Sequence, residues 1–187
     1  MVQPASIAAA GISGYSVVAI DPGPESSGWC WFDGTVRESG TDLNVVLRNR
    51  LQLGWDTRAV VFEQIESLGM IVGTSVFDTC FETGRMFQSA EEHRNSETLV
   101  TCIVRRRVKM HLCGTNTAKD ANVRQALLDR FGGKAVAIGK KATPGPLYGV
   151  SGHAWAALAI AVTWWDIAAP VIAEIAVTPK DSFDVAF

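Results

Sequence analysis

The sequence predicts an α/β fold, because short apolar runs of strand length alternate with longer segments in which apolar residues recur at helical spacing. The first strands follow one another across tight turns, which is typical of antiparallel neighbours. With 187 residues, 48% of them hydrophobic and 19% charged, the chain is long enough for one well-buried domain and too apolar to be disordered.

The first strand pair carries the first candidate functional residue. The apolar run Val17 to Ile20 ends in Asp21, a turn follows at Pro22-Gly23, and a second apolar run covers Ser26 to Phe32. A carboxylate at the end of a buried strand is rigidly held and still accessible, so Asp21 is a candidate metal ligand or acid/base group. Because Asp also favours turns, a purely structural role is the alternative.

The next segments repeat this pattern. Thr35 to Glu38 is expected to be a third strand, and Thr41 to cap a helix that Gly54 closes. The run Arg58 to Glu63 reads as another central strand that ends in a carboxylate. Two buried strands that end in acids are harder to attribute to chance than one.

A long helix is expected after Thr74 or Ser75, with one side formed by Val76, Cys80, Gly84 and Phe87. Such a stripe is usually core packing. Gly84 also lets another helix approach closely, so helix 75–90 is a candidate homodimer surface.

Further along the chain we expect a strand at Leu99 to Val104 and a helix that ends at Gly132-Gly133. Residues 134–150 are expected to form a long basic loop, and Ser151 to cap a last helix that contains His153 to Ala161.

The charges of the chain are unevenly distributed. The formal net charge is −2, but residues 85–141 carry twelve basic and five acidic side chains, between two acidic flanks. A charge run is usually a solvated face, yet few acids interrupt this one, which favours a phosphate-facing surface. The candidate DNA-binding residues are Arg105, Arg106, Arg107, Lys109, Lys119, Arg124, Lys140 and Lys141.

Other sequence features limit the possible settings of the protein. Its four cysteines lack metal-ligand spacing, so we expect reduced thiols and a cytoplasmic location. Residues 1–15 have no basic start typical of a signal peptide and are expected to be a flexible extension. The longest apolar run, Ala154 to Trp165, is too short to span a bilayer, and residues 167–187 are expected to form a C-terminal tail.

Three segments in chain order carry a family pattern: Ile20-Asp21-Pro22-Gly23 with Ser27-Gly28, then Phe62-Glu63-Gln64, and then His153 to Ala161. This ordered set resembles the RuvC-like Holliday junction resolvases, a branch of the RNase H fold, and especially their phage-encoded members. The resemblance implies an RNase H-like nuclease domain over residues 16–166. Its central mixed five-stranded sheet, with the first three strands antiparallel, would be flanked by helices.

In that family the first strand supplies a metal-binding Asp, the fourth strand a Glu, and the final helix the remaining ligands, commonly two acids three residues apart. The resemblance therefore implies that Asp21, Glu63 and His153 are catalytic residues and metal ligands. Asp120 is a further catalytic candidate, for which helix capping is the simpler alternative. The chain departs from the pattern at Ala156, which stands where the second acid would be and cannot bind a metal.

The basic segment fits the same family. Arg106 to Lys109 with Gly114, followed by Ala118 to Asp120 with Val123, resembles the family's basic strand and the helix after it, whose lysines contact backbone phosphate. The bases at the open centre of a junction would be contacted by Leu68, Met70 or Tyr148, although packing is the more ordinary role for each.

The function implied is Mg²⁺-dependent phosphodiester hydrolysis of four-way DNA junctions by a symmetric homodimer, with Mn²⁺ as a substitute metal. Three alternatives remain open: a branched-DNA-binding protein that does not cut, a nuclease for flaps or RNA–DNA hybrids, and an ATPase of the actin or sugar-kinase type. The last needs a second domain with its own phosphate loop, for which the chain has no second Asp-x-Gly corner.

Overall fold

Strand β1 (Val17–Asp21) lies at the centre of the sheet in the computed structural model, which describes residues 15–66, 69 and 71–177. The sheet has the order β3-β2-β1-β4-β5. Strands β2 (Ser26–Phe32) and β3 (Val36–Leu43) continue antiparallel from β1 on one side. On the other side, β4 (Ala59–Gln64) and β5 (Leu99–Val104) run parallel to it. The predicted mixed five-stranded sheet is therefore confirmed.

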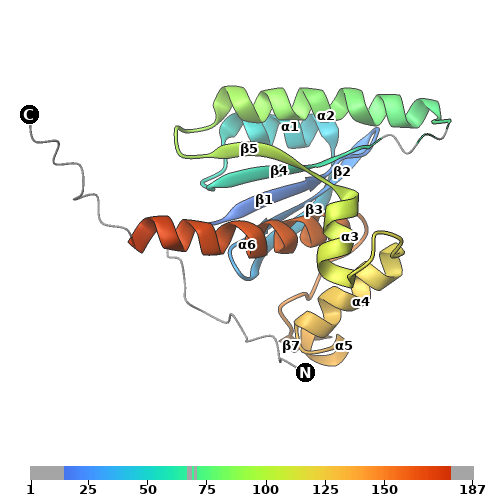
Figure 1. Ribbon diagram of the computed structural model, residues 1–187, viewed down its shortest axis with the longest axis vertical. Coiled ribbons are helices and arrows are strands. Elements are labelled where there is room, and N and C mark those ends of the chain that lie inside the picture. The colour runs from blue at the N-terminus through green and yellow to red at the C-terminus, as the bar shows by residue number, and fades with distance from the viewer. Residues whose placement is uncertain (1–14, 67–68, 70, 178–187) are drawn as a thin grey trace, which may run out of the picture.

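Both faces of the sheet are covered, as Figure 1 shows. Helices α1 (Asn44–Leu53) and α2 (Thr74–His93) lie on one face, and α6 (Ala154–Val177) lies on the other. Beyond the end of α6 that starts at Ala154 come α3 (Arg105–Cys113), α4 (Asp120–Arg130) and α5 (Lys134–Ile138). A short hairpin, β6 (Gly139–Lys140) and β7 (Thr143–Pro144), follows α5.

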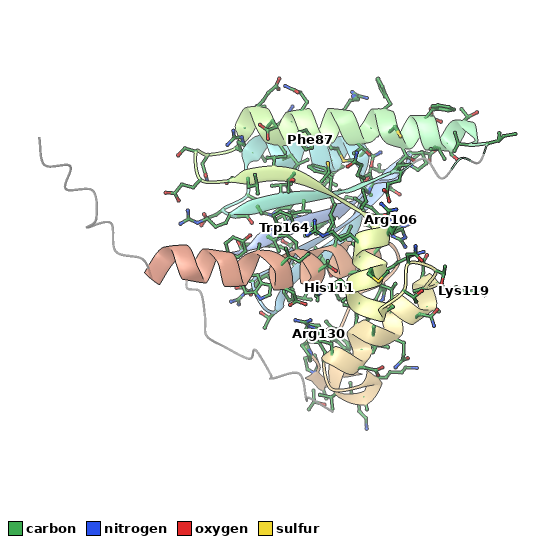
Figure 2. The ribbon with its side chains drawn as sticks, in the orientation of Figure 1. Phe87, Arg106, His111, Lys119, Arg130 and Trp164 are labelled. Carbon is green, nitrogen blue, oxygen red and sulfur yellow. The ribbon has the colours of Figure 1, made fainter. Side chains whose placement is uncertain are left out.

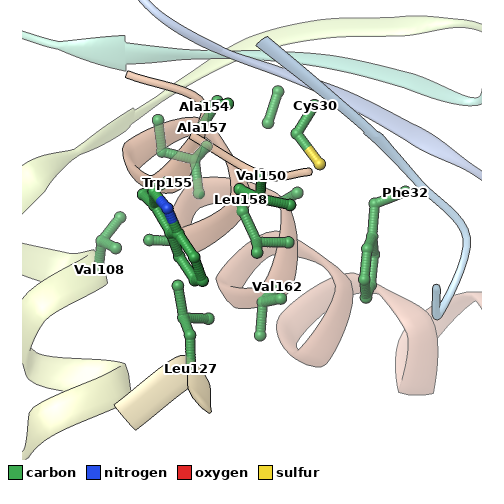
Figure 3. Packing of buried hydrophobic residues seen from close by; sticks show 14 of the residues in the cluster. Cys30, Phe32, Val108, Leu127, Val150, Ala154, Trp155, Ala157, Leu158 and Val162 are labelled. Atoms are coloured by element: carbon green, nitrogen blue, oxygen red, sulfur yellow. The ribbon is translucent and has the colours of Figure 1, made fainter. Parts of the chain in front are cut away.

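The alternation of side chains along β1 explains why its sequence is continuously apolar. Val17 and Ala19 belong to the core on the α6 side, whereas Val18 and Ile20 belong to the core under α1 and α2. All four are fully buried, as expected for a strand that is covered on both faces. Figure 3 shows the α6-side core, in which Trp155 of α6 lies near Val108 of α3 and Leu127 of α4, and which also contains Cys30 and Phe32 of β2.

Two expectations about element boundaries are wrong. Thr41 does not cap a helix, because β3 extends to Leu43 and Thr41 pairs with Gly28 of β2. Residues 134–150 are not a continuous loop, since they contain α5 and the β6–β7 hairpin. Buried Ala137 and Leu147 fix this segment, with the amide N of Leu147 donating to the carbonyl O of Ala137 at 2.8 Å.

The predicted basic strand is also wrong, because Arg105 begins the helix α3. Arginine and lysine are good helix formers, and the buried Val108 anchors the helix to the core. The helix ends at Gly114, whose left-handed backbone (φ 69°) lets its amide N donate to the carbonyl O of Met110 at 2.9 Å.

Candidate active site

Asp21 and Glu63 lie side by side at one edge of the sheet. Strands β1 and β4 are parallel, with Ile20 opposite Phe62, so the residues that follow, Asp21 and Glu63, are neighbours at the carboxyl ends of their strands. Their side chains are only 17% and 12% exposed. The structure thus brings together the two carboxylates that the sequence singled out.

A buried polar network holds the turn that follows Asp21. The Ser27 hydroxyl accepts a hydrogen bond from the amide N of Gly23 at 3.2 Å and donates to Asn44 Oδ1 at 2.7 Å. Asn44 Nδ2 donates in turn to the carbonyl O of Gly23 at 2.9 Å. Asn44, the first residue of α1, thus ties that helix to the corner beside Asp21. Sequence reasoning missed this role, for which no local pattern gave a signal.

Gly28 brings the start of α6 against the same corner. It pairs with Asp21 across the β1–β2 hairpin, and a Cβ atom at Gly28 would lie 2.3 Å from the carbonyl O of His153. Only glycine permits this approach. As a result, His153 Nδ1 lies 3.7 Å from Asp21 Oδ2, with a side chain that is 67% exposed.

Arg105 joins the site from the end of β5. Its Nη1 donates to Glu63 Oε2 at 2.7 Å and its Nη2 to Asp120 Oδ1 at 2.7 Å. Sequence reasoning grouped Arg105 with the DNA-binding arginines and missed its place among the carboxylates. One signal was available, since Arg105 directly follows the strand β5, just as Asp21 and Glu63 lie at the carboxyl ends of β1 and β4.

The surroundings shift the proton affinities of these groups. Burial raises the pKa of Asp21 to about 6 and that of Glu63 to about 7, although the Arg105 charge opposes both shifts. The hydrogen bond from Arg105 lowers the pKa of Asp120. Burial works to lower the pKa of Arg105, and the charges of Glu63 and Asp120 overcome it, so that pKa is raised.

These residues fit a hard divalent cation. Burial of two adjacent carboxylates makes their charged forms costly, and a cation bound between them would stabilise those forms. No group of three or more candidate ligands is preassembled within the described part of the chain. The set consists of Asp21 and Glu63, with His153 at its border and Ala156 contributing no ligand.

The other candidate DNA-binding residues lie around this edge and beyond it. Figure 2 shows Arg106 at the start of α3 and Lys119 just before α4. Arg106, Arg107, Lys119, Lys140 and Lys141 are exposed, and Lys109 is half-buried. Arg124 stacks over the Trp155 ring, with its Cζ 4.5 Å from the ring centroid. Tyr148 is 47% exposed, while Leu68 and Met70 lie outside the described residues.

Comparisons with known proteins place the fold. The structure of Thermus thermophilus RuvC matches with a TM-score of 0.57 and 18% identity, over 82% of this chain and 96% of RuvC. T. thermophilus RuvC in complex with Holliday junction substrate matches with a TM-score of 0.59 and 20% identity, over 82% and 94%. The chain therefore has a RuvC-like fold, as predicted.

Sequence comparison adds no assignment. No protein-family model matches the chain, and no curated protein matches it. Across the described residues, no helix combines the length and apolarity required to cross a membrane.

Proposed function

We propose that this protein is a divalent-metal-dependent endonuclease that resolves four-way DNA junctions. The observation that carries the proposal is the pair of buried carboxylates, Asp21 and Glu63, at adjacent strand ends of a RuvC-like fold. The exposed basic residues of α3 and of the segment before α4 support it, because such residues bind phosphate without reading sequence.

Hydrolysis requires that a water oxygen bond to phosphorus, that the bond from phosphorus to one deoxyribose oxygen break, and that this oxygen gain a proton while the water loses one. A bound Mg²⁺ or Mn²⁺ would supply charge neutralisation and water activation. Asp21 and Glu63 would hold it. His153, exposed at the border of the site, would act as a ligand or move a proton between water and the leaving oxygen.

The finer parts of the proposal concern the assembly and its setting. Symmetric cutting of two opposed strands calls for two copies of the site, which a homodimer formed through α2 would provide. We place this activity on branched DNA in the cytoplasm of a bacterial host, with a phage as the source of the enzyme.

A second candidate function is branched-DNA recognition with weak or absent cutting. Ala156 favours it, since this residue leaves the start of α6 with His153 as its sole candidate ligand among the described residues. The same basic surface would bind the junction, but the site would lack a ligand.

The test is cleavage of a synthetic four-way junction in Mg²⁺ and in Mn²⁺, beside linear duplex, flap and RNA–DNA hybrid. We expect paired symmetric nicks in the junction alone. Asp21→Asn and Glu63→Gln are expected to reduce cutting by about a thousandfold or more, with junction affinity nearly unchanged.

Undiminished cutting by either variant would exclude the proposed site. Tight junction binding by the natural protein without nicks in either metal would favour the recognition protein. Restoration of an acid by Ala156→Asp would then separate a disabled enzyme from a binding module.

A further inference from the structure

The three consecutive arginines at the start of α3 have different surroundings. The Arg106 side chain is 61% exposed and pairs with Glu66, and Arg107 is exposed. Arg105 is only 34% exposed and points into the carboxylate cluster. The register of β4 and β5 explains this, because Val104 pairs with Gln64, so the next residue reaches the edge where Glu63 lies. Arg105 therefore lies at the same edge of the sheet as Asp21 and Glu63.

Arg105 joins two carboxylates of unequal burial. Nη1 holds Glu63, whose side chain is 12% exposed, and Nη2 holds Asp120, whose side chain is 77% exposed. The contact with Glu63 is sheltered from water and the contact with Asp120 is open to it. An incoming phosphate would therefore compete with Asp120 more easily than with Glu63.

The site is short of ligands for two cations. Nucleases with two metal ions hold both on shared carboxylates and phosphate. Here Asp21 and Glu63 are the adjacent carboxylates, and Arg105 already neutralises part of their charge. Ala156, three residues after His153 in the first turn of α6, offers no ligand atom.

We propose that the site takes one divalent cation on Asp21 and Glu63, and that the Arg105 guanidinium supplies the second positive charge at the scissile phosphate. Asp120 is then the counter-ion that holds Arg105 until phosphate replaces it, and is not a metal ligand. This inference rests on the proposed nuclease function and names how the same site handles its substrate.

The geometry requires arginine in this role. A guanidinium presents donors in a planar fork, so one edge keeps Glu63 while the other turns to a phosphate oxygen. A lysine ammonium is a compact point charge on a flexible stem, which neutralises the same total charge but does not hold two partners in fixed directions. Charge and positioning are therefore separable by Arg105→Lys.

The experiment titrates Mn²⁺ into the protein, first alone and then bound to a pre-nicked four-way junction that supplies backbone phosphate, by calorimetry and by electron paramagnetic resonance, and measures cleavage of the intact junction in parallel. We expect one Mn²⁺ per chain. Arg105→Ala is expected to bind Mn²⁺ about tenfold more tightly, because a competing positive charge is gone, and to cut the junction about a hundredfold more slowly. These opposite directions distinguish the role of Arg105 from a general loss of structure.

The matched control is Arg58→Ala. Arg58 immediately precedes β4, at the end opposite Glu63, and forms an exposed ion pair with Glu97. Both Mn²⁺ affinity and cleavage are expected to stay as in the natural protein. Arg105→Lys is expected to keep Mn²⁺ affinity within about threefold and to lose most of the cleavage. Asp120→Asn is expected to keep one Mn²⁺ per chain, because Asp120 contacts Arg105 and is not a metal ligand.

Two Mn²⁺ per natural chain, equal or weaker Mn²⁺ binding by Arg105→Ala, or loss of the bound Mn²⁺ in Asp120→Asn would each overturn the inference. If Arg105→Ala does not fold, Arg105→Lys provides the test. Full cleavage by Arg105→Lys would show that the two-partner geometry of the guanidinium is not required, and would overturn the inference. If the natural protein cuts no substrate, the proposed nuclease function is wrong. The number of bound Mn²⁺ ions and their affinities would still show whether the site holds one cation or two. A natural protein that cuts, beside an equally active Arg105→Ala, would sink the inference alone.

Discussion

Gly28 sets how closely the start of α6 approaches the sheet corner that carries Asp21. Its missing side chain leaves room for the backbone of His153, with which a Cβ atom would collide at 2.3 Å. That backbone directly precedes Ala154, the buried first residue of α6, so it has little freedom to move away. The position of His153 beside Asp21 depends on this glycine.

We predict that Gly28→Ala lowers the free energy of unfolding by about 2 kcal/mol and reduces cleavage more than junction binding. The reason is that the added methyl group pushes His153 away from Asp21. Urea denaturation and single-turnover cleavage measure the two effects. Gly73→Ala, at a site where a Cβ atom meets nothing within 4 Å, serves as the control. Equal activity of Gly28→Ala and the natural protein would contradict a role for His153 at this position.

The buried acids make stability depend on pH. The folded protein binds the Asp21 proton more tightly than the unfolded chain does, because burial raises the pKa to about 6. This contribution is fully present below the unfolded pKa, near 3.8, and is lost as pH rises through about 6. Glu63 adds the same sign up to about pH 7. Without divalent cations, the protein should therefore be less stable at pH 8 than at pH 5.

Asp21→Asn removes the free-energy cost of burying an ionised carboxylate at position 21. At pH 8 it is expected to stabilise the cation-free protein by about 2 kcal/mol, which raises the melting temperature by several degrees, and the gain should disappear at pH 4. Thermal melts at the two pH values measure it. Added Mg²⁺ should raise the melting temperature of the natural protein much more than that of the variant. A gain of the same size at both pH values would show that the buried charge is not its cause.

At the scale of elements, α2 has one face in the core and one face without a partner in the described chain. Met86 and Ala90 are buried, whereas Phe77 and Phe81 are 63% and 67% exposed. Gly84 has open space around it, and clefts of about 640 and 380 Å³ lie on its two sides. This arrangement supports the proposed dimer surface, because large exposed aromatic side chains mark interaction sites.

Phe81→Glu is therefore expected to convert the protein from a dimer to a monomer at micromolar concentration, with little change in the fold, since the buried face of α2 is untouched. Sedimentation velocity measures the change. Leu53→Glu, on the 87% exposed last residue of α1, is the matched control and should remain dimeric. A natural protein that sediments as a monomer at all concentrations would remove α2 as a dimer surface.

The elements also show which parts of the structure could be predicted from the sequence. Runs such as Val17 to Asp21 and Leu99 to Val104 carry their signal locally, so their strands were predicted with accurate ends. Thr41 was wrongly assigned to a helix cap, because its true role depends on its pairing with Gly28 on a neighbouring strand. The residues next to Thr41 in the sequence do not reveal that pairing. The role of Arg105 depends on Glu63, 42 residues away, and on strand register. Locally it resembles Arg106 and Arg107.

At the scale of the whole molecule, an ion cluster fastens three helices together. Asp166 of α6 accepts from Arg130 of α4 through both carboxylate oxygens, at 2.6 Å each, and its Oδ2 lies 2.7 Å from His111 Nε2 of α3. The Asp166 side chain is 19% exposed. The α3–α4 pair carries most of the basic surface. The cluster thereby ties this pair to α6, which packs against the sheet in the same hydrophobic core.

We expect Asp166→Ala to lower the free energy of unfolding by about 1 to 2 kcal/mol, because it leaves Arg130 and His111 without their shared partner. Urea denaturation measures the change. Asp129→Ala, which loses only the exposed contact with Gln125, should cost about 0.5 kcal/mol or less. Equal midpoints for the two variants would mean that the cluster adds nothing to the attachment of α3 and α4.

The dispersal of the site along the chain has a consequence for the cell that makes it. Asp21 emerges early in synthesis, Glu63 and Arg105 follow, and His153 comes only with α6, after which β1 and β2 gain the cover of that helix. A ribosome-bound fragment that stops before residue 153 has both carboxylates but neither the completed core nor the histidine. The proposed nuclease would thus leave DNA intact during translation until α6 has been made and has packed against the sheet.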